Sequence, residues 1–431
     1  MTSIALWTIL VGALASVNCS LVGSFLVLRK MSLLGDAISH AVLPGIAIGF
    51  MLSGKITGPA IVLGAMGMGV LTAILTQWLS QYARVSEDAG MGVVFTSLFA
   101  LGVILINVAA KNVDLDAGCV LYGQIEFTSS KTLTLAGLDI PEAVISLGLI
   151  LILIVAMLAV LWKELKLSAF DSELADTLGF SSYLMHLLLM SMTSAVTVAA
   201  FESVGSILVV AMLIVPAATA SLLTTRLFNM MIMAAGTGIT SSILGYMLAD
   251  AWNTSVAGMM AVCAGLLFTG AVFLSPSQGV IVRLLRQIRL SLRVMREDVL
   301  SALYRAREKS QSGLQQAALL HNKGSWLRQY TMNVMKRRKL IDEVDGRIHL
   351  TQLGLQKAER IIRTHRIWES YLQRNVALPA DHLHSPAESI EHYVGPELLE
   401  SLSADLNRPA ADPHGKAIPG QTLSNEPPLQ Q

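Results

Sequence analysis

An acidic residue and a histidine lie inside the apolar stretch of residues 34–49, LGDAISHAVLPGIAIG. Asp36 and His40 are four residues apart, so on a helix they project from one face, one turn apart, close enough to bind one divalent cation together. Pro44 follows on the same face, and because its ring crowds the carbonyl of His40, that carbonyl becomes a spare oxygen. Ionisable residues within apolar spans are rare and mark ion pathways by default. We therefore predict a cation site here; the alternative is a structural pair, with the acid at the cytosolic end of the span and a hydrogen-bonded histidine in the bundle.

The same stretch carries small residues suited to close packing. Gly45 and Gly49 form a small-xxx-small surface on which another helix can pack. The motif GDAISHAVLPG closely resembles the second membrane segment of the permease subunits of ABC importers for zinc, manganese and iron. Residues 204–220, VGSILVVAMLIVPAATA, match another signature of that family, with Pro216 inside the segment. The resemblance implies a multi-pass protein of the bacterial inner membrane.

The resemblance also implies partners for the chain. No Walker motif occurs in the sequence, so the motor would be a separate ABC ATPase chain, and this chain is expected to be a transport subunit and not an enzyme. An extracytoplasmic metal-binding protein would deliver the ion. A second permease copy or a paralogue would complete the pore, with membrane lipid around it.

Composition divides the 431 residues into an apolar part and a charged part. The sequence is 53% hydrophobic and 14% charged, and the long apolar runs stop near Arg283. A spanning helix needs about 20 mostly apolar residues, which gives nine candidates: 4–28, 37–54, 58–80, 90–110, 142–162, 183–200, 203–223, 227–249 and 254–274. Basic residues fall at every second boundary, which places the C-terminal part in the cytosol. Eight spans is the alternative, since residues 183–200 are short and residues 119–134 could be re-entrant.

We therefore expect an all-α polytopic membrane protein with eight or nine spans, followed by a cytosolic winged helix-turn-helix and a helical metal-binding and dimerisation domain. The expected boundaries are residues 1–280 for the permease, 281–296 for a basic connecting helix, 297–352 for the winged-helix region, 353–420 for the metal-binding region and 421–431 for a disordered tail. Three isolated cysteines, without CxxC spacing, indicate neither a disulfide framework nor a zinc-thiolate site.

A polar segment interrupts the membrane part at residues 163–182. Its middle, FDSELADTLGF, predicts a short amphipathic helix that is too polar to enter lipid. The resemblance implies that this is the coupling helix that docks on the ATPase, with Glu173, Ala175, Asp176 and Gly179 at the contact. The alternative is an ordinary surface loop.

Residues 313–350 have the order of a winged helix-turn-helix: a helix over SGLQQAALLHNKG, a second helix over SWLRQYTMNVMKRRKLI, and a hairpin with Asp345 and Gly346 at its turn. The residues that could face DNA phosphates are Arg328, Lys336, Arg337, Arg338 and Lys339. The alternative is a docking module without operator binding, because basic residues alone do not separate the two.

Residues 297–420 closely resemble the diphtheria-toxin-repressor and manganese-transport-regulator family, through LTQLGLQKAERIIRTHRIWESYL, HLHSPAESIEHYV and DPHGKAIPG. The resemblance assigns Glu388, Glu391 and His392 to a primary metal site, and Glu388 and His392 have the i, i+4 spacing of one helix face. It assigns a neighbouring ancillary site to His365, Glu369 and His384, and a first-helix ligand to Asp298. This chain departs from the manganese-type pattern at Ser301, where a second first-helix carboxylate is expected. A carboxylate at position 388 favours manganese over softer ions, with iron and zinc as alternatives.

Two functions follow from these patterns. The first is a metal permease whose cytosolic domain senses the imported ion and regulates uptake. The second is a metal-dependent DNA-binding repressor that is tethered to the membrane or released from it by proteolysis. The ion-pathway motif and the coupling segment favour the first.

Overall fold

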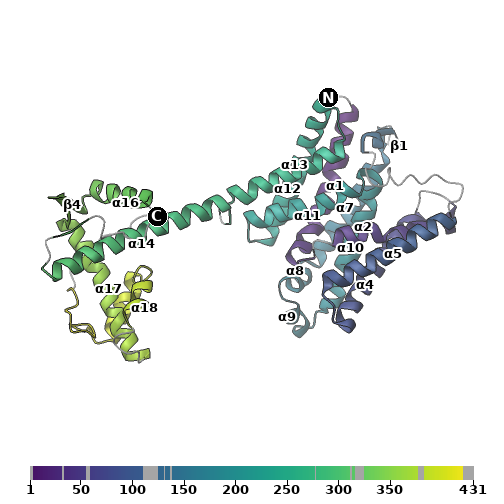
Figure 1. Ribbon diagram of the computed structural model, residues 1–431. Helices are drawn as coiled ribbons and strands as arrows, with labels where there is room; N and C mark the ends of the chain where they lie inside the picture. Colours follow the sequence, from purple (N-terminus) through teal and green to yellow (C-terminus); the bar gives the residue numbers. More distant parts are fainter. Residues whose placement is uncertain are drawn as a thin grey trace. The chain divides into compact units, whose positions relative to one another are not determined.

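The computed structural model describes residues 3–31, 34–54, 59–109, 125–130, 132–135, 138–276, 278–310, 313–315, 325–376 and 383–420. The chain divides into two compact units, Met1–Arg283 and Leu284–Gln431. Each unit is described by itself below, with the labels of Figure 1.

The first unit is a helical bundle. Its helices are α1 (Ser3–Leu28), α2 (Leu34–Ala41), α3 (Leu43–Ser53), α4 (Pro59–Ala83), α5 (Glu87–Ala109), α7 (Glu142–Val160), α8 (Trp162–Phe170), α9 (Ser172–Thr177), α10 (Ser182–Val204), α11 (Ser206–Leu223), α12 (Leu227–Trp252) and α13 (Val256–Leu274). The short 3-10 helix η1 (Ile125–Ser130) and an antiparallel hairpin of β1 (Thr132–Leu135) and β2 (Leu138–Pro141) lie between α5 and α7. Among the described residues, nine segments are long and apolar enough to cross a membrane, which confirms the polytopic fold.

The second of these segments is broken in the middle. α2 ends at Ala41 and α3 starts at Leu43, with Pro44 in the first turn of α3. The break follows from the missing N–H of Pro44, which leaves the His40 carbonyl without its usual i+4 donor. Sequence reasoning predicted the freed carbonyl but treated the segment as one helix.

Close packing around the broken segment explains its small residues. A Cβ atom on Gly45 would lie 2.2 Å from the carbonyl oxygen of Gly64 on α4, and one on Gly49 would lie 2.8 Å from that of Ala60. Any larger side chain would therefore push α3 away from α4. The small-xxx-small surface is used as expected for helix packing in a membrane.

The core of the first unit lies along α1, whose Val11, Val22 and Phe25 have no exposed surface. In contrast, α7 exposes Leu149 and Ile152, as a helix that faces lipid does. The bundle therefore has a packed interior and an apolar outer surface, as a membrane-embedded domain requires.

The second unit combines helices with a small sheet: α14 (Val280–Glu308), β3 (Leu314–Gln315), α16 (Ser325–Arg337), β4 (Ile341–Val344), β5 (Arg347–Leu350), α17 (Gln352–Val376), α18 (His384–Ile390) and α19 (Pro396–Asp405). The strand order is β3-β5-β4, all antiparallel. The β4–β5 turn has Asp345 and Gly346 at φ 51° and 71°, as its Asp-Gly sequence predicts. The core includes Met295, Val299 and Met335.

Two sequence expectations differ from this unit. The expected connecting helix over residues 281–296 is not a separate helix, because α14 runs from Val280 to Glu308. The helix expected to start near residue 313 is a strand at Leu314 and Gln315, which pair with Ile348 and Arg347. The rest of that expected helix, residues 316–324, lies outside the described residues, as does the expected tail at 421–431.

Candidate metal sites

The acid and the histidine of the broken segment lie side by side on α2. Asp36 Oδ1 is 3.6 Å from His40 Nε2. The His40 ring stacks on Phe95 of α5 and meets Phe99 edge-on, with ring centroids 6.0 and 5.6 Å away. About half of the Asp36 side chain (49%) and a third of that of His40 (36%) are exposed. Because ionisable groups in a span do not face lipid, the exposed edge of this pair must face protein or water.

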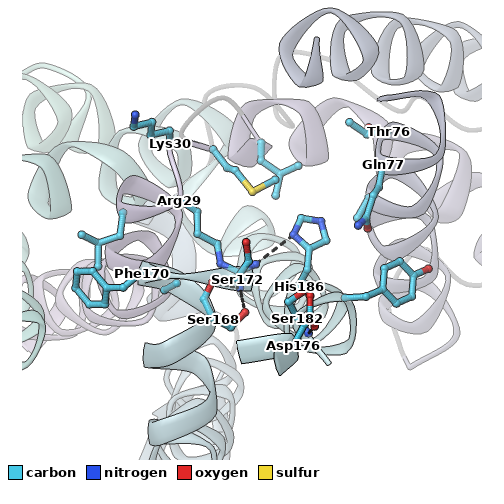
Figure 2. Close-up of a pocket in the computed structure, with 16 residues that line it drawn as sticks. Arg29, Lys30, Thr76, Gln77, Ser168, Phe170, Ser172, Asp176, Ser182 and His186 are labelled. Carbon is cyan, nitrogen blue, oxygen red and sulfur yellow. Dashed lines mark hydrogen bonds between the residues drawn. The ribbon is translucent and has the colours of Figure 1, made fainter. Parts of the chain in front are cut away.

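A polar cavity of about 620 Å³ opens near the ends of α1, α4 and α10 and beside α8 and α9. Figure 2 shows Arg29 in it, with Nη1 3.3 Å from His186 Nδ1 and Nη2 donating to the Ser168 carbonyl at 3.2 Å. Lys30 also lines it. Two cationic side chains make this cavity a poor place for a metal cation, so we do not assign one to it.

The predicted coupling segment forms the short helix α9 and a tight turn. Asp171 caps α9 by accepting from the Leu174 N–H at 2.9 Å, and Gly179 has a left-handed φ of 87°. Ala175 is fully buried, whereas Glu173 is exposed. Asp176 accepts from the Ser182 N–H at 2.8 Å and from the Ser182 hydroxyl at 2.7 Å, and these bonds lower its pKa. Asp176 therefore holds the turn against the start of α10, a role inside the chain.

In the second unit, three predicted ancillary ligands come together. His365 and Glu369 lie one turn apart on α17, and His384 starts α18. Glu369 Oε1 is 3.1 Å from His365 Nε2 and 3.0 Å from His384 Nδ1, and the two histidine nitrogens are 3.0 Å apart. These three atoms lie within 4.8 Å of one another. Two imidazole nitrogens and a carboxylate that converge on one point fit a divalent transition metal.

A second cluster surrounds His392. Its Nε2 lies 3.2 Å from Asp298 Oδ1 and 3.9 Å from Glu391 Oε1, and its Nδ1 lies 2.7 Å from Glu297 Oε2. Hydrogen bonds with Asp298 and Glu297 raise the pKa of His392 to about 10. In the metal-free chain both nitrogens therefore carry protons at neutral pH, and Nε2 gives up its proton when it becomes a metal donor.

His365 connects the two clusters. Its Nε2 faces Glu369 and His384, while its Nδ1 hydrogen-bonds Glu391. Burial alone would lower the pKa of His365, but the hydrogen bonds with Glu369 and Glu391 outweigh it and raise the pKa. Burial alone would raise the pKa of Glu369, but the hydrogen bonds with His365 and His384 hold it at about 2. Both side chains are almost fully buried, so these charges are compensated inside the domain.

Sequence reasoning missed Glu297, and the role of Glu388 as a metal ligand stays a prediction. Glu297 lies beside Asp298 on α14 and contacts His392, so the first helix does supply two carboxylates, although the second is not at Ser301. Ser301 is buried, and its hydroxyl has no hydrogen-bond partner among the residues that the structure describes. Glu388 is exposed on α18, and among the described residues no hydrogen bond or ion pair joins it to either cluster. Glu297 could have been found from the sequence, because it directly precedes Asp298 at the start of residues 297–420, the part that resembles the metalloregulators.

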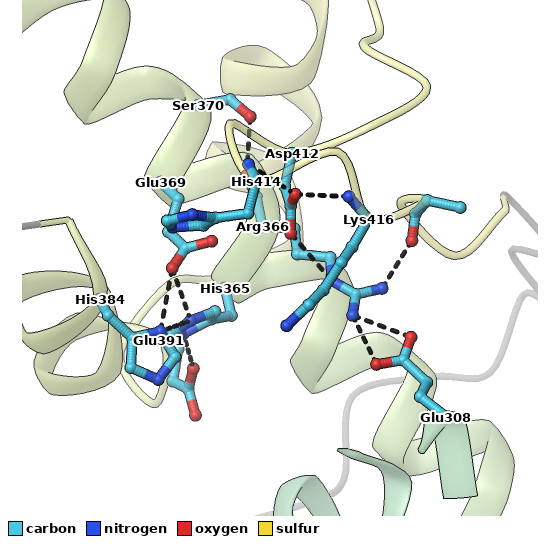
Figure 3. Close-up of polar contacts among 11 residues, drawn as sticks. Glu308, His365, Arg366, Glu369, Ser370, His384, Glu391, Asp412, His414 and Lys416 are labelled. Carbon is cyan, nitrogen blue, oxygen red and sulfur yellow. Dashed lines mark hydrogen bonds and ion pairs between the residues drawn. The ribbon is translucent and has the colours of Figure 1, made fainter. Parts of the chain in front are cut away.

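A buried arginine braces this region (Figure 3). Arg366 follows His365 on α17 and donates two hydrogen bonds to Glu308 at the end of α14, at 2.8 and 2.7 Å. Its Nε is 3.3 Å from Asp412, and its Nη1 donates to the Ala417 carbonyl at 2.6 Å. The C-terminal DPHGKAIPG segment is thereby fixed to α17 and α14, next to the metal ligands.

The predicted DNA-facing residues lie on or just after α16. Lys336, Arg337, Arg338 and Lys339 are exposed, and Lys336 pairs with Glu343 of the hairpin. The side chain of Arg328 lies outside the described part of the structure. Four of the five predicted residues thus form a basic helix end beside the hairpin.

Comparisons with known proteins match both units. Residues 351–420 match the domain described as "Iron dependent repressor, metal binding and dimerisation domain". The manganese transport system membrane protein MntD of Bacillus subtilis is 46% identical over 285 residues, which cover 66% of this chain and 96% of that protein. The zinc transport system membrane protein TroD of Treponema pallidum is 37% identical over 299 residues, covering 69% of this chain and 82% of the relative.

Among solved structures, PsaBC from Streptococcus pneumoniae in complex with Fab matches with a TM-score of 0.55 and 31% identity, over 64% of this chain and 94% of the matched chain. MntD and TroD are named as membrane proteins of a manganese and a zinc transport system. The chain is an integral membrane protein with a divalent-metal-binding domain at its C-terminal end. Its residues 1–275, more than half of its length, match the profile of the ABC 3 transport family, and the chain belongs to that family.

Proposed function

We propose that this chain is the permease subunit of an ABC importer for manganese, with a cytosolic domain that senses the imported ion and regulates uptake. The observation that carries the proposal is the pairing, in one chain, of an acid and a histidine in a broken membrane span with a set of carboxylate and imidazole donors in the second unit. Relatives named for manganese and zinc transport support the choice of ion.

Asp36 and His40 are the proposed transport site. A discontinuous span places half-helix ends and free carbonyls next to the ion, as in other transporters. The exposed edge of the pair is then the wall of the pathway, and a second permease copy or a paralogue forms the opposite wall. The ion is substrate here, so a site with few protein ligands suits rapid release.

The α9 segment is the proposed docking point for the ATPase. Its exposed Glu173, Leu174 and Leu178 form the surface offered to a partner, while buried Ala175 and left-handed Gly179 set the shape of the turn. Asp176 stabilises the segment through its hydrogen bonds with Ser182. Movement of the ATPase would therefore reach α10 directly through the bonds between Asp176 and Ser182.

The second unit is the proposed sensor, with His365, Glu369 and His384 as ligands of one metal and Asp298, Glu391 and His392 as ligands of a second. Glu297 positions His392: by accepting from Nδ1 it leaves Nε2 as the metal donor, the carboxylate–histidine arrangement common around metal sites. Oxygen and imidazole donors without thiolate suit manganese, while zinc and iron are the alternatives. Glu388 could join only by moving toward His392.

Regulation follows from the continuity of α14. The helix that starts at Val280 carries Glu297 and Asp298, so a change at the sensor site acts on a helix that begins shortly after the last span in the sequence. Metal can shift the balance between two arrangements only by its difference in affinity for them. A tenfold difference at each of two sites would supply about 2.7 kcal/mol, enough to favour a resting transporter.

The test is ATP-driven uptake by the chain reconstituted with its ATPase and its binding protein, with manganese, zinc and iron in competition. We expect manganese to be taken up and to be the strongest competitor. Uptake of none of the three would contradict the proposal. The second candidate, a DNA-binding repressor, rests on the exposed basic residues of α16; it predicts metal-dependent retention of operator DNA by the full chain in nanodiscs, lost at high salt.

A further inference from the structure

We propose that residues 280–293 of α14 form a membrane-surface helix that binds anionic phospholipid. The segment starts just after the short stretch 275–279 that follows the last span, α13, so it leaves the bilayer next to the headgroups. It belongs to one uninterrupted helix whose later part, from Met295 onward, is buried in the core of the second unit. The two parts of this helix thus have different surroundings.

One face of the segment is apolar and exposed. Ile281, Leu284, Leu285 and Ile288 have the helical spacing i, i+3, i+4, i+7, and between 38% and 55% of each is exposed. The same stripe continues into Met295 and Val299, which have no exposed surface because the second unit covers them. The stripe from Ile281 to Ile288 is therefore exposed, whereas its continuation at Met295 and Val299 is buried.

The opposite face is basic. Arg283, Arg286 and Arg293 lie on it together with Leu290, and Arg289 lies at the edge of the apolar stripe. No acidic residue occurs between Val280 and Arg296. Arginine and apolar residues on opposite faces are the pattern of helices that lie in the plane of a membrane surface, with their apolar side below the headgroups. The guanidinium groups would then meet lipid phosphates, which bind them in a bidentate manner.

The charges of the segment favour lipid over a second copy of the helix as the partner that covers the apolar stripe. Two copies packed along the apolar stripe would bring flanking arginines together, and the segment has no acidic residue to pair with them. Anionic lipid supplies both the apolar layer and the opposite charge. The nearest acid, Glu297, pairs with Arg293 at 3.2 Å and lies beyond the exposed stripe.

The experiment uses the full chain in nanodiscs of phosphatidylcholine, with or without phosphatidylglycerol. Nitroxide labels are placed at Ile288→Cys on the apolar face and at Arg286→Cys on the basic face, after replacing Cys19, Cys119 and Cys263 by Ala. Access to oxygen reports lipid, and access to a water-soluble nickel complex reports solvent. With phosphatidylglycerol, we expect label 288 to gain oxygen and lose nickel access by severalfold, and label 286 to stay open to nickel.

A charge series avoids the cysteine changes. Hydrogen exchange of amides 281–292 should slow at least about tenfold in anionic nanodiscs for wild type and for Arg283→Lys, Arg286→Lys, Arg289→Lys, because lysine keeps the charge. The matching triple change to Glu should abolish the slowing. Label 288 shielded from both probes would indicate a second copy, and nickel access at both labels would indicate water; either result, or slowing that ignores lipid charge, would overturn the proposal.

Discussion

The two proposed metal sites of this chain, one in the membrane part and one in the second unit, are built differently. The membrane pair, Asp36 and His40, consists of two half-exposed side chains 3.6 Å apart. The clusters of the second unit use more donors, and His365, Glu369 and Glu391 are almost fully buried and joined by hydrogen bonds. A site with few, exposed ligands suits an ion that must be released. A site with buried, oriented ligands suits an ion that stays bound. The difference supports the proposal that one chain carries a passage site, Asp36 and His40, and a retention site, the two clusters of the second unit.

The largest effect should come from breaking the passage site alone. The double change Asp36→Ala, His40→Ala should reduce ATP-driven manganese uptake to the background of vesicles without ATP, because both proposed ligands of the pathway are lost. Manganese binding by the second unit should not change. Ser39→Ala is the control, since Ser39 lies between them and bonds only the Gly35 carbonyl among the described contacts. Uptake that persists in the double variant would refute the transport site.

Removing the brace of the retention site should cost stability. Arg366→Ala leaves Asp412 buried without its cation and releases Glu308, and loss of one partner of a buried ion pair costs about 3–5 kcal/mol. Hydrogen exchange of the α17 amides should accelerate accordingly. Arg374→Ala on the same helix is the matched control, because Arg374 is exposed and makes one surface bond to Asp405. Equal exchange in the two variants would contradict a bracing role for Arg366.

The role of Glu297 sharpens the comparison, since the membrane pair has no such orienting residue among its described contacts. Glu297→Gln should weaken manganese binding by the second unit about 10–100-fold, because the His392 ring loses the carboxylate that orients it. Isothermal calorimetry on the full chain measures this. Glu397→Gln, an exposed glutamate on α19, is the control. Unchanged affinity would show that Glu297 does not orient His392 for metal binding.

Among the predicted coupling residues, the structure distinguishes two exposed acids: Asp176 bonds Ser182, whereas Glu173 is offered to a partner. Glu173→Lys should uncouple ATP hydrolysis from uptake, while Asp176→Asn should have the smallest effect, because asparagine still accepts a bond from Ser182. The lowered pKa of Asp176 means that its charge stabilises the folded turn above the ordinary value of 3.8 and is lost only as pH falls below it. Coupling should therefore be constant from neutral to mildly acid pH. Uncoupling by Asp176→Asn alone would reverse this assignment.

Much of this organisation could be predicted from local pattern. Apolar length gave the spans, the Asp36–His40 spacing placed both groups on one helix face, and Asp345-Gly346 gave the hairpin. What local pattern did not predict depends on contacts between distant segments. Nothing in the spacing of Glu388 and His392 shows that His392 turns toward α14 while Glu388 stays exposed. The strand at Leu314 forms only because β5 lies beside it, and the Arg366 brace joins parts of the chain that no periodicity connects.

The central claim is that the retention site governs the passage site, and uptake at controlled cytosolic metal tests it most directly. Vesicles that contain the chain, its ATPase and its binding protein are loaded with increasing manganese on the cytosolic side, and initial ATP-driven uptake is compared for wild type and Glu391→Ala, His392→Ala. We expect wild-type uptake to fall as cytosolic manganese rises, and the variant to continue at its metal-free rate. Equal inhibition of both proteins, or of neither, would contradict the account.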